Sequence, residues 1–193
     1  MNDIILASQS PRRKQLLELA GVNFKIIPAN IDESSFSLLP PEDAVISSSK
    51  AKAKNISSKN PDYWVLAADT IVVINNKILG KPTSKSHARE MLKTLSGKTH
   101  QVLTGYTICC EDKKKSFHNV VTTEVCFKKL LEDEIDWYIH TNEPYDKAGA
   151  YAIQGIGAFI VKSINGSYTN VVGLPICEVM EFLTQNNIIN RNQ

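Results

Sequence analysis

An apolar run from Trp64 to Ile74 is interrupted only by Asp69 and its neighbour Thr70. The run is rich in β-branched and aliphatic residues and ends at Asn75-Asn76, which predicts a buried strand followed by a tight turn. A carboxylate inside such a run is costly to bury unless it is paired, bound to a metal or placed at a cleft. We therefore interpret Asp69 as a catalytic or metal-binding acid; the alternative is an acid at a strand end or bulge.

The position of Thr70 adds a geometric condition. Successive side chains of a regular strand point to opposite faces, so Asp69 and Thr70 should not share a ligand there. If both contact one ligand, the pattern predicts a bulge or a strand end at this point.

The rest of the chain predicts an α/β protein whose sheet is mixed rather than purely parallel. One helix is expected to begin at Ser10-Pro11 and to end at Gly21, and a second to begin at Pro40-Pro41. Further helices are expected at Ala88–Leu95, at Ile135–Ile139 and after Pro175. Apolar segments predict strands at Ile4–Ser8, Phe24–Ile27, Val102–Cys110, Phe117–Phe127, Ala150–Gln154 and Ala158–Ile164.

Composition excludes several classes of protein. The net charge of +2 and the absence of a basic stripe argue against a nucleic-acid partner. No uncharged stretch is long and continuous enough to span a bilayer, and no secretory leader is expected, so a membrane partner is excluded. The four cysteines form no CxxC pair, which disfavours a zinc site. We expect reduced thiols and a cytoplasmic location.

Residues Ser8 to Arg13 predict an anion site. A strand leads here into a helix N-terminus, whose free N–H groups and positive dipole favour a bound anion. Arg12 and Arg13 in the first helical turn oppose the usual charge preference, and a bound phosphate would resolve that conflict. The alternative is that both guanidinium groups are simply solvated.

Three further segments could complete this site, although each has an ordinary structural explanation. Asp32 and Glu33 offer acids for a cation. Lys50 and Lys54 lie four residues apart on one helical face, a pattern that more commonly marks a solvated surface. Lys81 follows Gly80 in a predicted turn. No P-loop or nucleophile-elbow sequence is present.

These motifs resemble the Maf family of nucleotide pyrophosphatases. The resemblance covers essentially the whole chain and rests on ordered matches at Leu6–Arg13, Ile31–Glu33, Lys50–Ala51, Ala68–Thr70, Gly80–Pro82, Leu95–His100, Thr104–Gly105, Glu143–Gly155, Asn165–Tyr168 and Val172–Pro175. It implies an elongated α/β fold with a mixed sheet and a central cleft, similar to inosine-triphosphate pyrophosphatases. It also implies that residues 1–193 form a single domain of two lobes, and that the protein is a homodimer.

The resemblance also assigns roles to individual residues. Asp69 matches the catalytic acid that accepts a proton from the attacking water, and Glu33 matches an acidic position associated with the cation. The positions that line the triphosphate site are matched by Ser8, Arg13, Lys50 and Lys81. Substrate choice is expected to follow Arg12, Thr70 and Gln154, which are similar to the branch acting on dTTP and UTP; the 7-methyl-GTP branch carries Trp, Gln and Glu there.

The implied activity is hydrolysis of dTTP, UTP and modified pyrimidine triphosphates to the monophosphate and pyrophosphate, as house-cleaning of noncanonical nucleotides. Glu33 and Asp69 offer the hard oxygen ligands that suit Mg²⁺ or Mn²⁺. The competing hypothesis is a nucleotide-binding regulator of cell division with weak or no hydrolysis.

Overall fold

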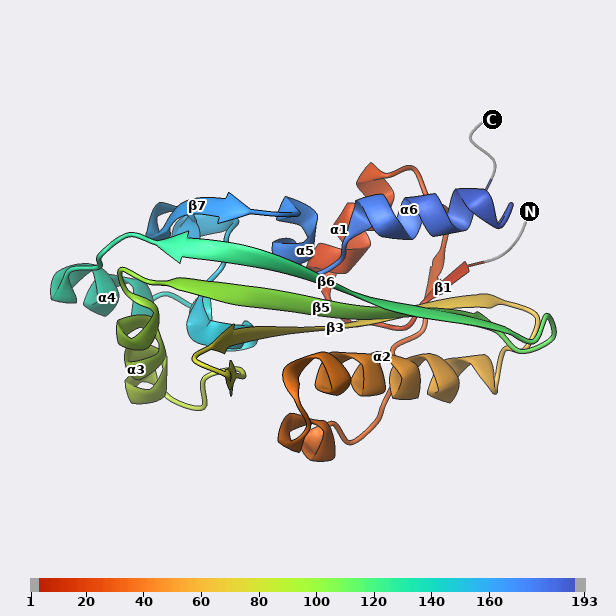
Figure 1. Cartoon of the computed structure of the whole chain (residues 1–193), viewed down its shortest axis with the longest axis horizontal. Helices are drawn as coiled ribbons and strands as arrows, with labels where there is room; N and C mark the ends of the chain where they lie inside the picture. Colours follow the sequence, from red (N-terminus) through yellow and green to blue (C-terminus); the bar gives the residue numbers. More distant parts are fainter. Residues whose placement is uncertain (1–3, 190–193) are drawn as a thin grey trace.

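The computed structural model describes residues 4–189, whose strands form one mixed sheet in the order β2-β1-β3-β5-β6-β7, with β4 paired to β3. β1 is parallel to β2 and β3, and every other pair is antiparallel. The predicted α/β class with an elongated mixed sheet is therefore confirmed (Figure 1). The strands are β1 Ile4–Leu6, β2 Lys25–Ile26, β3 Trp64–Ile74, β4 Lys77–Leu79, β5 Thr99–Cys110, β6 Lys115–Phe127 and β7 Val161–Asn165.

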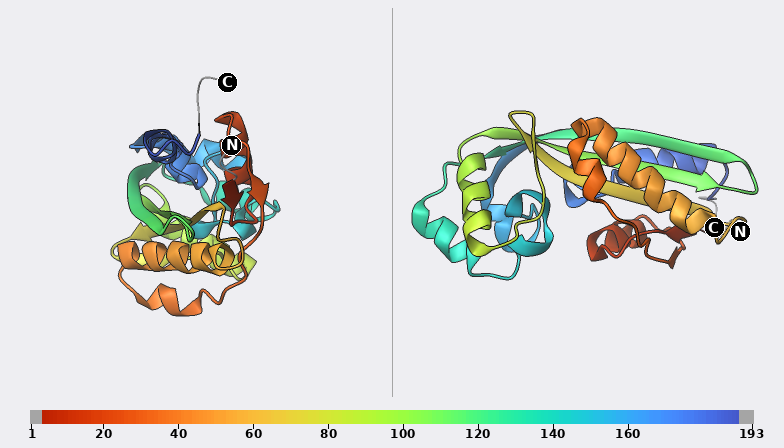
Figure 2. Two further views of the ribbon diagram at one scale, coloured as in Figure 1. Left: turned by 90° about the vertical axis from the view of Figure 1, so that its right-hand side faces the viewer. Right: turned by 90° about the horizontal axis from the view of Figure 1, so that it is seen from below.

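Helices cover both faces of the sheet. The long helix α2 lies against one face, and α1, α5 and α6 lie against the other (Figure 1; Figure 2, left). Helices α3 and α4 pack on each other at one end of the molecule. The helices are α1 Pro11–Leu19, α2 Pro41–Ser57, α3 Lys85–Leu95, α4 Glu132–Ile139, α5 Tyr168–Val172 and α6 Ile176–Gln185, with 3₁₀ turns at Ser34–Leu38, Pro144–Asp146, Ala148–Ala150 and Gly155–Ile160. Within residues 4–189, no helix combines the length and the apolar character needed to cross a membrane.

Local sequence signals set several boundaries as predicted. The Ser10 hydroxyl accepts a hydrogen bond from the Arg13 N–H and caps α1, which ends before Gly21 at a φ of 72°. Asn75 and Asn76 adopt φ angles of 49° and 60°, the left-handed pair that a two-residue hairpin turn requires between β3 and β4.

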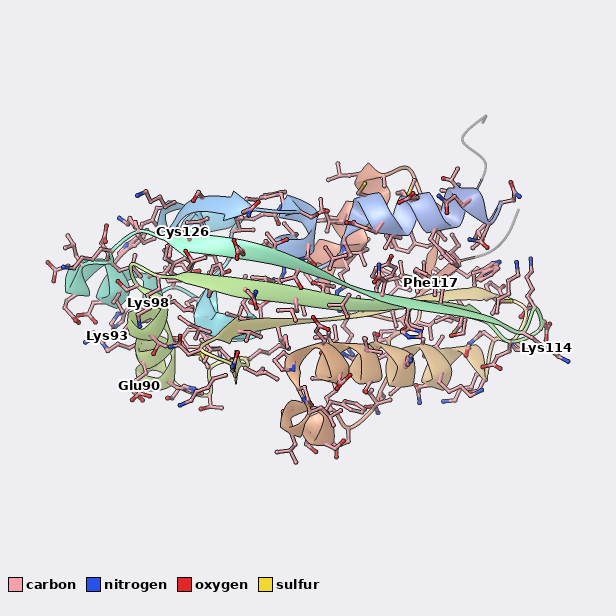
Figure 3. All side chains as sticks on the ribbon, viewed as in Figure 1. Glu90, Lys93, Lys98, Lys114, Phe117 and Cys126 are labelled. Carbon is pink, nitrogen blue, oxygen red and sulfur yellow. The ribbon has the colours of Figure 1, made fainter. Side chains whose placement is uncertain are left out.

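Strands β5 and β6 form a hairpin that runs the length of the molecule. Its register continues from Thr99 opposite Cys126 to Cys110 opposite Lys115. Lys114, in the charged turn, lies at one end of the molecule and Cys126 lies near the other (Figure 3). This hairpin therefore connects the two ends of the molecule through one continuous pair of strands.

The core consists of three groups of buried side chains. One group lies between the sheet and α1 and α6, where the Phe117 and Phe182 rings stack at 4.4 Å between centroids. A second joins α3, α4 and the segment near Tyr151. The third lies under α2 and contains small residues such as Ala53 and Ala67. The space between the first two groups, at the middle of β3, is where polar side chains gather.

One edge of β3 is interrupted at that point. Its pairing with β1 ends at Leu66, and its pairing with β4 begins at Val72, so among residues 4–189 no strand pairs with this edge at residues 67–71. The opposite edge stays paired with β5 throughout, including Asp69 opposite Gly105. The interruption opens the sheet from the side without breaking β3.

The predicted strand at Ala150–Gln154 is wrong. Ala150 has a φ of 59°, and the segment after it is irregular up to the 3₁₀ turn at Gly155–Ile160. Tyr151 and Ala152 are buried, which explains the apolar pattern, but the Ala152 N–H donates to the Tyr138 hydroxyl rather than to a strand. The strand predicted at Ala158–Ile164 exists only in its second half, as β7.

Candidate active site

A cavity of about 720 Å³ opens at the interrupted edge of β3. This volume is within the range of small-molecule and cofactor sites. Its walls come from the β1–α1 turn, from β3, from the turn around Lys81 and from the segment Asp146–Gln154. The charged residues that line it are five cationic and three acidic ones: Arg12, Arg13, Lys52, Lys81 and Lys147, with Glu33, Asp69 and Asp146.

In the wall of the cavity, Lys52 joins the two acids Glu33 and Asp69. The Lys52 ammonium nitrogen lies 2.6 Å from Glu33 Oε2 and 2.8 Å from Asp69 Oδ1. The side chains of Lys52 and Asp69 are 11% and 22% exposed, whereas that of Glu33 is 51% exposed. Burial by itself raises the pKa of Glu33, but hydrogen bonds from Lys52 and Ser48 and the Lys52 charge outweigh it, so the pKa lies below its ordinary value.

Arg13 occupies the opposite side of β3 and contacts only uncharged acceptors. Its guanidinium donates to the Gly173 carbonyl at 2.8 Å and to the hydroxyls of Ser8 and Thr70 at 3.1 Å each. Burial lowers the pKa of Arg13, and the charge of Asp69 acts in the opposite direction, but a guanidinium stays protonated in proteins. Within the described part of the chain, no carboxylate pairs with it at salt-bridge distance. Arg13 is therefore a partly buried cation that neutral acceptors hold in position, and its charge is available to pair with an anionic ligand.

Arg12 and the segment after α4 form the mouth of the cavity. Arg12 Nη1 lies 2.9 Å from Asp146 Oδ2, and Lys147 Nζ lies 2.5 Å from the other oxygen of Asp146. Gln154, further along the same segment, is exposed and lines the cavity. Residues from the start of the chain and from the segment Asp146–Gln154 thus line the same part of the cavity.

The structure brings together eight of the predicted site residues and leaves one outside. Ser8, Arg12, Arg13, Glu33, Asp69, Thr70, Lys81 and Gln154 all line the cavity. Lys50 does not: it is exposed, and its charge acts on His118 of β6 instead. Because successive helical residues are rotated by 100°, Lys50 and Lys52 point in very different directions.

Sequence reasoning missed Lys52, although the helical period contained a signal for it. The buried positions of α2 include Val45, Ser48, Ser49, Ala53 and Ile56, and Lys52 belongs to the same face. A lysine on the buried face of an amphipathic helix needs a partner, and here it has two. Lys147 was missed as well, and its sequence neighbourhood carries no comparable signal.

The alternative interpretation of Asp69, an acid at a bulge or strand end, is contradicted by the structure. β3 keeps regular register with β5 through Asp69 and Thr70. Asp69 faces α2 and Thr70 faces Arg13, as alternation requires. Both nevertheless line one cavity, because the open edge of β3 lets the cavity extend around the strand to both faces.

The donor set suits a divalent cation that is shared with a polyanion. Two carboxylates converge on one point, now held by the Lys52 ammonium. Within residues 4–189, no group of three or more His, Cys, Asp or Glu side chains could hold a metal alone. Mg²⁺ is commonly bound by one or two carboxylates, with phosphate oxygens and waters completing the shell. Glu33 and Asp69 would be the protein ligands.

A mixed α/β sheet whose long central strand β3 is open along part of one edge is a fold shared with solved structures. The structures of a HAM1 protein from Coxiella burnetii and of the Staphylococcus aureus Ham1 protein superpose with TM-scores of 0.50 and 0.52. Each match covers 96% of this chain and 100% of the other, at 16% and 14% sequence identity. At this identity the likeness concerns the fold alone.

Sequence comparisons define the family. The model for Maf-like proteins matches residues 3–186. A dTTP/UTP pyrophosphatase from Syntrophus aciditrophicus (strain SB) is 51% identical over 180 residues, which cover 93% of this chain and 88% of the relative. A second, from Bacillus thuringiensis subsp. konkukian (strain 97-27), is 50% identical over 188 residues, 97% of each chain. The chain belongs to the Maf family.

Proposed function

We propose that this protein is a nucleoside triphosphate pyrophosphatase that hydrolyses dTTP and UTP to the monophosphate and pyrophosphate. Its Maf-family membership and its half-identical relatives, which are dTTP/UTP pyrophosphatases, support this activity. The observation that carries the proposal is the partly buried Arg13 guanidinium, which contacts only neutral acceptors and faces the same cavity as the acid Asp69. A triphosphate would supply the missing negative charge, and the acid would act on the attacking water.

In this proposal the cations bind the triphosphate and Asp69 moves the proton. Arg12, Arg13 and Lys81, with Ser8 at the helix start, would bind phosphate oxygens. Water attacks the α-phosphorus, the bond from that phosphorus to the bridging oxygen of the β-phosphate breaks, and pyrophosphate leaves. The water proton passes to the Asp69 carboxylate, whose Oδ2 accepts no hydrogen bond from any residue between 4 and 189.

Lys52 would hold Asp69 in place for this transfer, and a divalent cation is part of the proposal. Lys52 binds Oδ1 of Asp69, so the carboxylate cannot rotate away from the cavity. Mg²⁺ or Mn²⁺ bound to Glu33 and Asp69 would supply charge neutralisation and acidify bound water.

Base selection is proposed for Arg12, Thr70 and Gln154. Gln154 has an exposed amide at the cavity wall, where it could pair with the edge of a pyrimidine. Thr70 bonds Arg13 and Thr104, so its hydroxyl has a fixed direction. Modified pyrimidine triphosphates would be accepted where the modification points away from Gln154.

Pyrophosphate release tests the proposal directly. Purified protein is mixed with dTTP, UTP, CTP, GTP or 7-methyl-GTP, with Mg²⁺, with Mn²⁺ or with a chelator. The expected result is metal-dependent release that favours dTTP and UTP. Preference for 7-methyl-GTP would overturn the substrate assignment, and no release from any nucleotide would favour a nucleotide-binding regulator instead.

Asp69→Asn tests the role of the acid. The Asn amide oxygen can still accept from Lys52 Nζ, so the fold and nucleotide binding should survive. Loss of the proton acceptor should lower kcat by about 10²-fold or more. Circular dichroism and UTP binding are the controls, and near-normal turnover by a folded variant would remove Asp69 from the mechanism.

Three predictions about the whole molecule stay predictions. They are a single domain of two lobes over residues 1–193, a homodimer and a cytoplasmic location. Light scattering of the purified protein measures the second.

A further inference from the structure

The wall of the cavity at Tyr151–Gln154 has no strand to hold it in place. This segment is irregular and lines the same cavity as Arg12 and Lys147. A loop that lines a binding cavity needs its backbone groups satisfied elsewhere if it is to keep one shape. The residues that satisfy them come from α4 and from the turn directly after it.

Glu143 accepts three hydrogen bonds that fix the end of this wall. Its Oε1 accepts from the Ile156 N–H at 2.9 Å. Its Oε2 accepts from the Gly157 N–H and from the Tyr138 hydroxyl, both at 2.7 Å. The Tyr138 oxygen in turn accepts from the Ala152 N–H at 3.2 Å. One carboxylate and one phenol therefore hold both sides of the loop that carries Gln154.

The loop is shaped around this pair of side chains. Gly155 has a φ of 78°, and a Cβ there would lie 2.2 Å from Glu143 Oε1. A Cβ on Gly157 would lie 2.6 Å from the Tyr138 hydroxyl oxygen and from the Ala152 carbonyl oxygen. Both glycines are needed because the backbone passes directly over the carboxylate and the phenol.

Glu143 does not line the cavity, so any effect on a ligand passes through the backbone it holds. Its own carbonyl accepts from Lys147 Nζ at 2.7 Å, and Lys147 binds Asp146, the partner of Arg12. Glu143 thus connects the loop that carries Gln154 with the ion pair between Arg12 and Asp146.

We propose that Glu143, together with Tyr138, is a positioning residue that sets nucleobase selection by holding the loop Ala152–Gly157 against the cavity. The inference rests on the proposed nucleotide pyrophosphatase function. Arg13, Lys81 and Asp69 lie on other elements, and Glu143→Gln keeps the backbone carbonyl that binds Lys147, so this change should affect base recognition and leave the chemical step in place.

The test compares Glu143→Gln and Tyr138→Phe with a matched control, Glu134→Gln. Glu134 is another carboxylate that anchors backbone, since its Oε2 accepts from the Leu131 N–H at 3.0 Å, but it is not among the residues of the cavity. Values of kcat and KM are measured for UTP, dTTP and GTP. We expect Glu143→Gln to raise KM for UTP about tenfold, with kcat within about twofold, and to reduce the preference for UTP over GTP. Tyr138→Phe should act in the same direction, and Glu134→Gln should behave as wild type.

Amide hydrogen exchange gives a readout that does not depend on activity. In Glu143→Gln, the amide of either Ile156 or Gly157 should exchange faster than in wild type, because the glutamine NH₂ group only donates and one of the two N–H groups loses its acceptor. Unchanged exchange and an unchanged UTP-to-GTP ratio would overturn the inference, as would a loss confined to kcat. If Glu143→Gln fails to fold, Tyr138→Phe carries the test, and the amide expected to exchange faster is then that of Ala152, which loses its acceptor.

The failure of the proposed function would look different. A wild-type protein that releases no pyrophosphate from any nucleotide rejects the activity itself. The positioning role is then judged by calorimetric binding of UTP and GTP, whose difference in affinity must shrink in Glu143→Gln. Equal differences in wild type and variant would reject it.

Discussion

Replacing Lys52 with methionine removes the cation that lies between two carboxylates and keeps a side chain of similar length. In the wild type the ammonium is 2.6 Å from Glu33 and 2.8 Å from Asp69, and only 11% of the lysine side chain is exposed. The variant leaves both acids facing each other across a thioether.

The expected loss of stability follows from the exposure of the two acids. Asp69 is 22% exposed, and losing the partner of a mostly buried charged group costs about 1–3 kcal/mol. Glu33 is 51% exposed, so solvent screening limits its share to less than about 1 kcal/mol. A total of about 2 kcal/mol corresponds to a melting temperature about 4–8 °C lower for a domain of this size.

The pH dependence has a defined sign. The pKa of Glu33 lies below its ordinary value of 4.5, because Lys52 outweighs the raising effect of burial. A carboxyl with a lowered folded pKa contributes stability that is complete above the unfolded value and is lost as the pH falls through the folded value. The gap in stability between wild type and Lys52→Met should persist at pH 7 and narrow below pH 4.5.

Thermal melts at pH 7 and pH 4, followed by circular dichroism, measure both effects. Lys54→Met is the matched control, since Lys54 lies on the same helix and pairs with Glu111 at 2.8 Å, but its side chain is 70% exposed. Lys54→Met should have the same melting temperature as the wild type. Equal melting temperatures for wild type and Lys52→Met at pH 7, or a gap that widens in acid, would refute this account of the Lys52 bridge.

Two other perturbations probe the structure around the site. Gly105→Ala should destabilise the fold by about 1–3 kcal/mol and lower the rate of pyrophosphate release, because its Cβ would lie 2.6 Å from the backbone of Val45 and displace α2, which carries Lys52. Gly80→Ala, whose Cβ would have no neighbour within 4 Å among the described residues, is the stability control in urea unfolding, and equal losses in both variants would contradict the argument. Burial lowers the pKa of His100 from 6.5 to about 4, so the unfolded chain takes up a proton before the folded one and stability falls by up to about 3 kcal/mol as the pH drops through this range. His100→Gln should reduce that slope in urea unfolding at pH 7, 5 and 4, and an unchanged slope would show that another group causes it.

Elements with strong local signals were predictable from sequence. The boundaries of β3 and the start of α2 follow from an apolar run with a turn signal and from Pro40-Pro41. The segment Ala150–Gln154 misled the prediction because its side chains are buried like those of a strand, while its backbone bonds to a side chain from α4. The short helix α5 carries its own cap at Ser167 but is too brief to show a periodic pattern.

The site was only partly predictable, for a similar reason. Asp69 stands out because a carboxylate in an apolar strand is costly. The choice between Lys50 and Lys52 depends on which face of α2 is buried, and the pattern of small residues on that face decides it. The contact between Arg13 and the carbonyl of Gly173 joins residues 160 positions apart and leaves no local trace.

The length of β3, β5 and β6 has a mechanical consequence. Each of these strands has 11 to 13 residues, and together they run without a break past the cavity from one end of the molecule to the other (Figure 1). The two ends are therefore not joined by a flexible connector, and bending one toward the other would require elastic deformation of three hydrogen-bonded strands at once. A ligand entering the cleft meets a stiff floor, and the Gln154 loop at its wall is itself held by Glu143 and Tyr138.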